Sequence, residues 1–365
     1  MIISDITNYI EEIAPLPFQE SYDNAGLIVG NKNSEITGVL ITLDVTEDVV
    51  QDAINQNLNL IIAHHPIVFS GLKKINGNNY VERTVIKAIK NDIAIYAAHT
   101  NIDSVLYNGV NSKICEKLGL EKTKILAPSK ENLNKVVVFV PHKNADEVRK
   151  AMLDADAGKI GNYDSCTFNL QGHGTFKAGE NASPHIGEIN KVHTEPETRI
   201  ETVVPNHLLN KVISAMIKAH PYEEVAHDIY DLKNTWSQVG AGMIGELPEA
   251  IETMEFLKNL KKTFNCDFIR HTQLTSDKIK KVAVCGGAGS FLLKDAIRAK
   301  ADIFITGDFK YHQFFDAENH IIIADIGHFE SEQYTKELFF ELLTRKFSNF
   351  AIRLTKVNTN PIKYL

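Results

Sequence analysis

Short, nearly continuous apolar runs recur along this chain and limit the folds that it can adopt. GVLITL covers residues 38–43, LNLIIA covers residues 58–63, and IAIYAA follows near residue 95. Amphipathic stretches such as TEDVVQDAINQN and NNYVERTVIKAIKND lie between these runs. Strands that consist of continuous apolar runs are buried on both faces, with helices covering the sheet. The pattern therefore predicts a layered α/β domain.

The middle of the chain has a different pattern. After the polar stretch APSKENLNK, four segments read as strands and two as helices, in the order KVVVFVP, ADEVRKAMLDADA, CTFNLQG, ETRIETVVP, HLLNKVISAMIKAH and EEVAHDIYDL. A Gly-rich excursion separates the two middle strands. This β-α-β-β-α-β order is typical of a ferredoxin-like α+β domain. We predict such an insert at 129–234, interrupting an α/β domain formed by 1–128 and 235–365.

The α/β pattern returns after the insert. KKVAVCGGAGS reads as a strand and a Gly turn, FLLKDAIRAK and YHQFFDAENH as helices, ADIFITGD and HIIIADI as strands, and FESEQYTKELFFELLTRKF as one long helix. The N-terminal MIISDITNYIEEI reads as an amphipathic helix with Ser4 as its N-cap.

Composition excludes several classes of protein. The 365 residues carry a net charge of -7 and contain no long basic stripe, so we expect no nucleic-acid binding. No apolar stretch reaches the roughly 18 residues of a membrane helix, and the acidic N-terminus is unlike a signal peptide. We therefore expect a cytoplasmic location and no membrane partner. The four cysteines form no CxxC pair, and Cys285, after a strand-like run, is expected to be a buried free thiol.

Two adjacent histidines, His64 and His65, end the run LNLIIA and precede Pro66. Neighbouring side chains of a strand point to opposite faces, so both can face one site only if the strand has already ended. Pro66 suggests that the strand has ended there. It also biases His65 toward an extended conformation. Diverging imidazoles at the carboxyl end of a strand suit two separate metal ions, and α/β sheets place their sites at that end.

Two further pairs of side chains follow apolar runs in the same way. His99 and Asp103 come after IAIYAA, and His328 and Glu332 come after HIIIADI. Side chains four residues apart meet on a helix, so His328 and Glu332 can form a metal half-site if a helix begins there. His64, His65, Asp103, His328 and Glu332 together suit two divalent transition ions, with one carboxylate between them.

Each residue also has an ordinary structural explanation. Asp103 can cap the segment that follows it, and Glu332 can be a first-turn carboxylate favoured by the helix dipole. A single histidine at a strand end is most often a polar residue with a satisfied hydrogen bond. Three such clusters behind three buried runs favour the metal hypothesis.

The chain resembles the dinuclear-metal proteins grouped as GTP cyclohydrolase type-two homologues, the Nif-three-like family. The matching segments are SYDNAGLIVG, LIIAHHPIVF, AAHTNIDSV, GGAGS, TGDFKYH and DIGHFESE, in order along the α/β portion. The insert resembles that of the longer family members through GHGTFKAGENASPHIG and AHPYEEVAHDIYDL.

The resemblance implies two metal ions per chain. Carried over to this sequence, His64 and Asp103 hold one ion, His65 and His328 hold the other, and Glu332 bridges them. The ion implied is zinc, with iron and manganese as alternatives. The resemblance also implies that the insert is similar to trimeric nitrogen-regulator and copper-tolerance domains, and that six chains form a hollow toroid.

Three functions remain open on the sequence. The first is a two-metal hydrolase that opens the ring of GTP or another nucleotide with an activated water, using His99 or His312 for proton transfer and Asp308 to orient His312. The second is a metal-binding toroidal scaffold or regulator without turnover. The third is a phosphoesterase-like hydrolase with another small-molecule substrate.

Three other motifs are assigned more modest roles. Gly286 to Gly289, in GGAGS, form either a phosphate cradle opening a helix or simply a tight turn. Asp23 and Asn24 suit a structural turn in which the Asn side chain bonds its own backbone. His220 and Glu224 are spaced for a metal only in a helix, which Pro221 disfavours, so a trimer interface or polar surface is expected.

Overall fold

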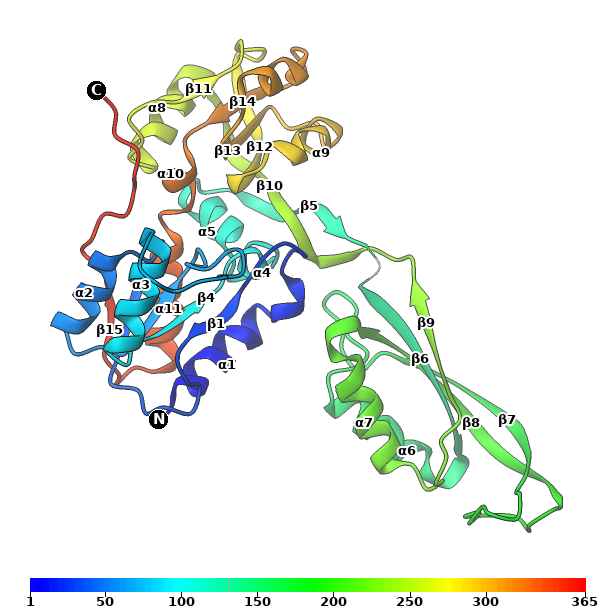
Figure 1. Cartoon of the computed structure of the whole chain (residues 1–365). Helices are drawn as coiled ribbons and strands as arrows, with labels where there is room; N and C mark the ends of the chain where they lie inside the picture. Colours follow the sequence, from blue (N-terminus) through cyan, green and yellow to red (C-terminus); the bar gives the residue numbers. More distant parts are fainter. Residues whose placement is uncertain (131) are drawn as a thin grey trace. The chain divides into compact units, whose positions relative to one another are not determined.

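The structure is a computed structural model that describes residues 1–130 and 132–365. It divides into two compact units, one formed by Met1–Pro128 with Gln238–Leu365 and the other by Ser129–Ser237. Each unit has its own sheets and helices (Figure 1). The mixed α/β architecture that the sequence predicts is present, and no helix among the described residues is long and apolar enough to cross a membrane.

The first unit contains two sheets. The five-stranded sheet has the order β1-β4-β3-β2-β15, with strands β1 Gly26–Val29, β2 Val39–Thr42, β3 Leu60–Ala63, β4 Ala94–Ala97 and β15 Ile352–Leu354. The six-stranded sheet has the order β11-β14-β13-β12-β10-β5, with strands β5 Glu121–Ser129, β10 Trp236–Glu252, β11 Arg270–His271, β12 Lys278–Ala288, β13 Ile303–Gly307 and β14 Ile322–Asp325. Four neighbouring strands of the five-stranded sheet are parallel, β15-β2-β3-β4, and three of the six-stranded sheet are parallel, β12-β13-β14.

Helices cover these sheets. They are α1 Ile3–Ile13, α2 Glu47–Asn55, α3 Tyr80–Lys90, α4 Thr100–Asp103, α5 Val110–Lys117, α8 Thr253–Thr263, α9 Leu293–Arg298, α10 His328–Glu332 and α11 Thr335–Lys346, with 3-10 turns η1 Leu16–Phe18, η4 Ser290–Leu292 and η5 Tyr311–Ala317. Every residue of β2, β3, β4 and β14 is buried, which explains why these strands appear as continuous apolar runs.

A single hydrophobic cluster joins the two sheets of this unit. Ile62 and Tyr96 of the five-stranded sheet belong to the same cluster as Val284 and Ile305 of the six-stranded sheet. Burying apolar side chains contributes roughly 25 cal/mol per Å² of surface removed from water. This shared cluster therefore stabilises the packing of the two sheets against each other. The sequence predicted one layered domain, and the structure builds it from two sheets around one core.

Three local predictions are wrong. The first helix begins at Ile3, and its N-cap is Ile2 rather than Ser4; the Asp5 carboxylate accepts a hydrogen bond from the Ile2 backbone at 2.8 Å. The segment YHQFFDAENH forms the 3-10 turn η5 instead of an α-helix. The expected long last helix is divided into α10 and α11, which places His328 and Glu332 on a short helix of their own.

The second unit is a four-stranded antiparallel sheet with two helices. Its elements are β6 Leu133–Pro141, η2 His142–Asn144, α6 Ala145–Asp154, β7 Thr167–Lys177, β8 Val192–Pro205, η3 Asn206–Leu208, α7 Leu209–Ala219 and β9 His227–Leu232. The sheet order β7-β8-β6-β9 gives the ferredoxin-like α+β arrangement expected for this segment. The strand β7 is longer than predicted, because it continues through GHGTFK.

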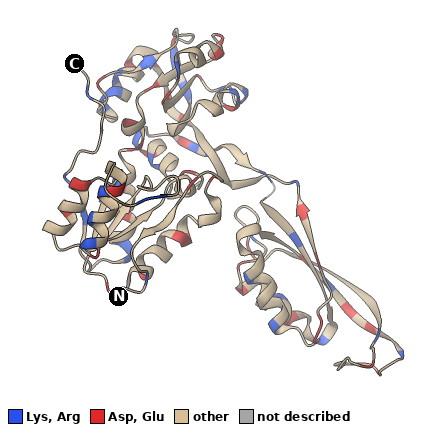
Figure 2. Cartoon of the chain, in the orientation of Figure 1, with Lys and Arg blue, Asp and Glu red and all other residues tan. Residues whose placement is uncertain are grey.

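Charged residues of both signs are spread over the ribbon (Figure 2). This mixture agrees with the modest net charge of -7. The four cysteines are free thiols, and Cys285 is buried as expected.

Candidate metal centre

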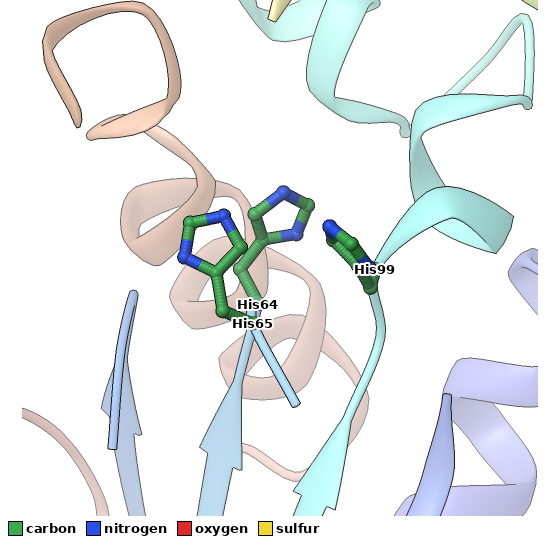
Figure 3. A group of neighbouring side chains, drawn as sticks. All are labelled: His64, His65 and His99. Atoms are coloured by element: carbon green, nitrogen blue, oxygen red, sulfur yellow. The ribbon is translucent and has the colours of Figure 1, made fainter. Parts of the chain in front are cut away.

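The two adjacent histidines follow β3, at the point where the strand has ended. The backbone N–H groups of His64 and His65 both donate to the carbonyl of Leu43, at 3.1 and 3.0 Å. The regular strand ladder is therefore interrupted, and the two imidazole rings lie on the same side with centroids 4.8 Å apart (Figure 3). The interruption expected from Pro66 allows neighbouring residues to face one site.

His64 is fully buried and directs one ring nitrogen toward two carboxylates. Its Nδ1 lies 2.9 Å from the Ala98 carbonyl oxygen, so Nδ1–H donates there and Nε2 carries a lone pair. That Nε2 lies 3.7 Å from Asp103 Oδ1 and 3.5 Å from Glu332 Oε1. Among the described residues, His64 Nε2, Asp103 Oδ1 and Glu332 Oε2 are buried atoms without a hydrogen-bond partner.

His65 and His328 present a matching pair of nitrogens. His65 Nδ1 lies 2.7 Å from Asp44 Oδ1, and His328 Nδ1 lies 2.7 Å from Asp308 Oδ2. The two Nε2 atoms lie 3.3 Å apart, and at 3.0 and 3.1 Å from Glu332 Oε2. With Nδ1–H donated to a carboxylate, each Nε2 carries a lone pair. Lone pairs and a carboxylate that converge in this way need a cation or protons between them.

The glycine-rich segment at the end of β12 makes room for Glu332. A Cβ atom on Gly287 would lie 2.4 Å from Glu332 Oε1, and one on Gly286 would lie 3.2 Å from Glu332 Cγ. Gly287 also has a φ of +62°, which favours glycine. The carboxylate side chain therefore occupies the space that the phosphate-cradle hypothesis assigned to a ligand, and the glycines are explained by this close approach.

All five residues for which the sequence predicts a metal role come together. His64, Asp103 and Glu332 form one group whose ligand atoms lie within 4.8 Å of one another, and His65, His328 and Glu332 form a second. The two groups share Glu332. The site lies where the carboxyl ends of β3 and β4 meet the carboxyl ends of β13 and β14, so it draws on both sheets of the first unit.

His99, predicted as a proton-transfer residue, lies in the same place. Its ring centroid is 5.2 Å from that of His64 and 5.3 Å from that of His65, and its ligand atom groups with theirs (Figure 3). His99 Nδ1 lies 2.7 Å from Asp23 Oδ1, and this contact helps to hold the pKa of Asp23 below its usual value despite burial. The position makes His99 either an acid–base group or an additional ligand.

The other two predicted catalytic residues are placed differently. His312 is exposed in η5, where its ring contacts Tyr311 and Phe315, and it is not among the residues that line the site cavity. Asp308 contacts His328 rather than His312. The structure thus brings Asp308 to the site and leaves His312 outside it.

Two functional carboxylates were missed in the sequence. Asp44 accepts from His65 and, through its other oxygen, from Thr359 Oγ1 at 2.6 Å. Asp23 lies in a turn as expected, because its N–H donates to the Glu20 carbonyl at 2.9 Å, and its carboxylate also contacts His99. Asn24 Nδ2 donates to the Val68 carbonyl at 2.6 Å instead of bonding its own backbone. Asp44 directly follows the buried run GVLITL, so the strand-end rule that found the histidines would have found it.

Burial and close charges perturb the pKa values of the cluster. Burial and the neighbouring Glu332 raise the pKa of Asp103 to about 8. Burial opposes protonation of His65, but Asp44 and Glu332 outweigh it and raise its pKa to about 10. Burial is likewise outweighed at His328, whose pKa rises to about 9 through Glu332 and Asp308. The pKa of Glu332 is lowered well below its usual value, because nearby imidazoles outweigh its burial. The cluster therefore holds protons when no cation is bound.

A cavity of about 840 Å³ opens onto this cluster. Its wall includes His65, His99, Asp103, His328 and Glu332, together with aromatic side chains. In the second unit, His220 was expected at a trimer interface or on a polar surface rather than in a metal site. His220 is buried there, with Nε2 2.9 Å from the Phe139 carbonyl and Nδ1 accepting from the Tyr222 N–H at 3.1 Å, so neither ring nitrogen remains for a metal or for a polar surface.

The fold and the site define an α/β protein with a candidate metal-binding centre between two sheets. The chain belongs to the Duf34/NIF3 (NGG1p interacting factor 3) family, whose profile matches residues 1–361. It is 41% identical over 365 residues to a Halalkalibacterium halodurans protein, covering 99% of this chain and 98% of that one, and 38% identical over 370 residues to a Bacillus subtilis protein, with the same coverage. Both relatives carry the name GTP cyclohydrolase 1 type 2 homolog.

Solved structures agree with this membership. A Bacillus cereus protein related to NIF3 superposes with a TM-score of 0.85 at 41% identity, covering 100% of this chain and 99% of that one. A Staphylococcus aureus protein superposes with a TM-score of 0.80 at 29% identity and the same coverage. The fold of this chain is therefore similar to both of these solved structures along its full length.

Proposed function

We propose that this protein is a dinuclear metal-dependent hydrolase. In this proposal His64 and Asp103 hold one ion, His65 and His328 hold the other, and Glu332 bridges the two. One observation carries it: lone pairs of three imidazoles converge on a buried carboxylate, while the opposite ring nitrogens are already hydrogen-bonded. This is how histidine ligands are held in metal sites.

The donor set suits zinc, with iron and manganese as alternatives. When bound, such ions lower the pKa of a coordinated water and supply a hydroxide nucleophile. The chain's own residues then have distinct tasks. Asp44 and Asp308 fix the tautomers of His65 and His328, and His99, held by Asp23, lies close enough to move a proton at the cavity wall.

Ring opening of a nucleotide by hydrolysis is the reaction that the names of the relatives suggest. A phosphoesterase-like reaction uses the same centre and stays a second candidate, and a metal-dependent scaffold without turnover is the third. For the assembly, we propose the homohexameric toroid implied by the family resemblance, with trimers formed through residues 129–234, in the cytoplasm.

The first test is the metal content of the chain, measured by plasma mass spectrometry after purification without chelator or added metal. We expect about two ions per chain, in line with the two ligand groups that share Glu332. The identity of the ions then selects the metal for turnover assays over a panel of nucleotides and phosphoesters.

A content well below one ion per chain, not restored by zinc, manganese or iron, would contradict the metal centre. Full occupancy without turnover of any compound in the panel would favour the scaffold. Replacing His99 by Gln is expected to reduce turnover while the ions remain, whereas loss of metal from that variant would make His99 a ligand.

A further inference from the structure

The walls of the cavity above the cluster are acidic and aromatic. We infer that the compound transformed there is a planar ring compound of low negative charge, such as a nucleoside or a base, rather than a nucleoside triphosphate. This inference rests on the proposed hydrolytic function of the same centre, and it narrows the substrate class.

Acidic side chains dominate the charge of the cavity wall. Among the described residues that line it there is no lysine or arginine, whereas the carboxylates number five: Glu20, Asp44, Asp103, Asp308 and Glu332. Two divalent ions would offset four of these negative charges. No excess positive charge would remain on the cavity wall to neutralise a triphosphate. The wall would therefore repel a triphosphate.

One basic side chain, Lys336, interacts electrostatically with Asp44 from behind the wall, but it does not line the cavity. The Lys336 ammonium lies 5.9 Å from the centroid of the Phe329 ring, and Phe329 lines the cavity while Lys336 does not. Triphosphate sites in other proteins combine a lysine or arginine with backbone N–H groups of a glycine-rich loop. Here the glycine-rich segment is packed against Glu332, so that cradle is occupied by a carboxylate.

Aromatic side chains offer a surface for a ring instead. Tyr22, Phe69 and Phe291 line the cavity and are 62%, 51% and 66% exposed, unusually open for large apolar side chains. The rings of Tyr22 and Phe69 are 6.1 Å apart, and that of Phe69 is 6.2 Å from His99. Exposed rings beside a reactive centre bind planar heterocycles by stacking, without regard to charge.

The test compares ligands that share a ring and differ in charge. Guanosine, GMP and GTP, with adenosine, AMP and ATP as a second series, are titrated calorimetrically into the metal-loaded full chain, and metal content is measured again afterwards. We expect affinity to fall from nucleoside to triphosphate by about tenfold or more. Triphosphates that bind as tightly as the nucleosides, or no binding by any compound, would overturn the inference.

Charge variants sharpen the comparison. Glu20→Lys places a cation on the cavity wall and keeps the backbone hydrogen bond of residue 20 to Thr100, so it should raise GTP affinity relative to guanosine several-fold. Glu35→Lys makes the same charge change at an exposed residue outside the cavity and should leave the ratio unchanged. Equal effects of the two variants would contradict a role for the local charge.

Ring variants test the stacking surface. Tyr22→Ala and Phe291→Ala should each weaken guanosine binding several-fold, whereas Tyr163→Ala removes an exposed ring of the second unit and should not. Failure of the proposed function gives a different result. A chain without metal or turnover would end the hydrolase proposal, while the ratio of nucleoside to triphosphate binding would still decide the inference.

Discussion

Both units contain a cavity with histidines in its wall, but the histidines of the two units have different partners. In the first unit, His64, His65 and His328 each have Nδ1 bound to an acceptor and Nε2 directed at one carboxylate. In the second unit, a cavity of about 980 Å³ is lined by His173 and His185. No group of three potential metal ligands was found there among the described residues.

Two histidines of the second unit that do not line this cavity have ring nitrogens engaged by other groups. His193 Nε2 lies 2.9 Å from Glu195 Oε2, and both nitrogens of His220 are engaged by the backbone. Glu197 is buried at the cavity wall, where burial raises its pKa and the Tyr222 hydroxyl donates to it at 3.2 Å. The feature that marks the first unit as a candidate metal centre is therefore the convergence of imidazole nitrogens on one shared carboxylate.

The largest expected effect comes from the shared carboxylate. Glu332→Gln should remove both ions, because the group with His64 and Asp103 and the group with His65 and His328 both contain Glu332. The matched change Glu197→Gln, at the buried carboxylate of the second unit, should leave metal content unchanged. Metal content per chain measures both, and retention of both ions in Glu332→Gln would contradict the bridging role.

A pair of glycine variants separates backbone strain from the site. Gly287→Ala and Gly161→Ala both place a side chain at positive φ, +62° and +57°, at a cost of about 1–2 kcal/mol. Only the Cβ at residue 287 meets Glu332, while nothing lies within 4 Å at residue 161. Thermal unfolding should show a similar loss of stability in both variants. Metal content should fall in Gly287→Ala alone. Equal metal content in the two variants would contradict this prediction, because it would show that the site keeps its ions when Glu332 is displaced.

The carboxylates behind the histidines give the next effect. Asp44→Asn and Asp308→Asn should each lower metal affinity by about 10–100-fold, since they weaken the contacts that orient His65 and His328. Glu195→Gln, which alters the carboxylate beside His193 in the second unit, should have no effect on metal affinity. Chelator competition measures the series. If Asp44→Asn binds metal as tightly as the wild type, the contact between Asp44 and His65 has a structural role only.

The smallest effect is a pH dependence of the metal-free chain. The folded pKa values of His65 and His328, about 10 and 9, exceed the ordinary histidine value of 6.5, so the folded state binds more protons than the unfolded state. The two protonated histidines stabilise the folded, metal-free chain fully below pH 6.5. This stabilisation is lost as the pH rises toward 9 and 10. The melting temperature gained on metal loading should therefore increase by a few degrees between pH 6.5 and 9. A constant gain would contradict competition between metal and protons.

Much of the site could be predicted from local sequence, since its ligands sit just past buried strands. The strand-end rule points to His64, His65, Asp103, His328 and Glu332 as candidate ligands, and the structure brings these five side chains together. The same rule applied to Asp44 would have found a sixth residue. His312 shows the limit of the rule, because it follows a strand yet turns away in η5 to pack against Tyr311.

The sequence by itself determined the strands and the insert. Short continuous apolar runs separated by amphipathic stretches are typical of interior strands, and the polar break near residue 128 marks the change of unit. Tertiary structure alone decided the division of the first unit into two sheets, the contacts of Asp23 with His99 and of Asp308 with His328, and the approach of Gly287 to Glu332. These depend on distances between segments far apart in the chain, which are set by the packing of a shared core and leave no local pattern.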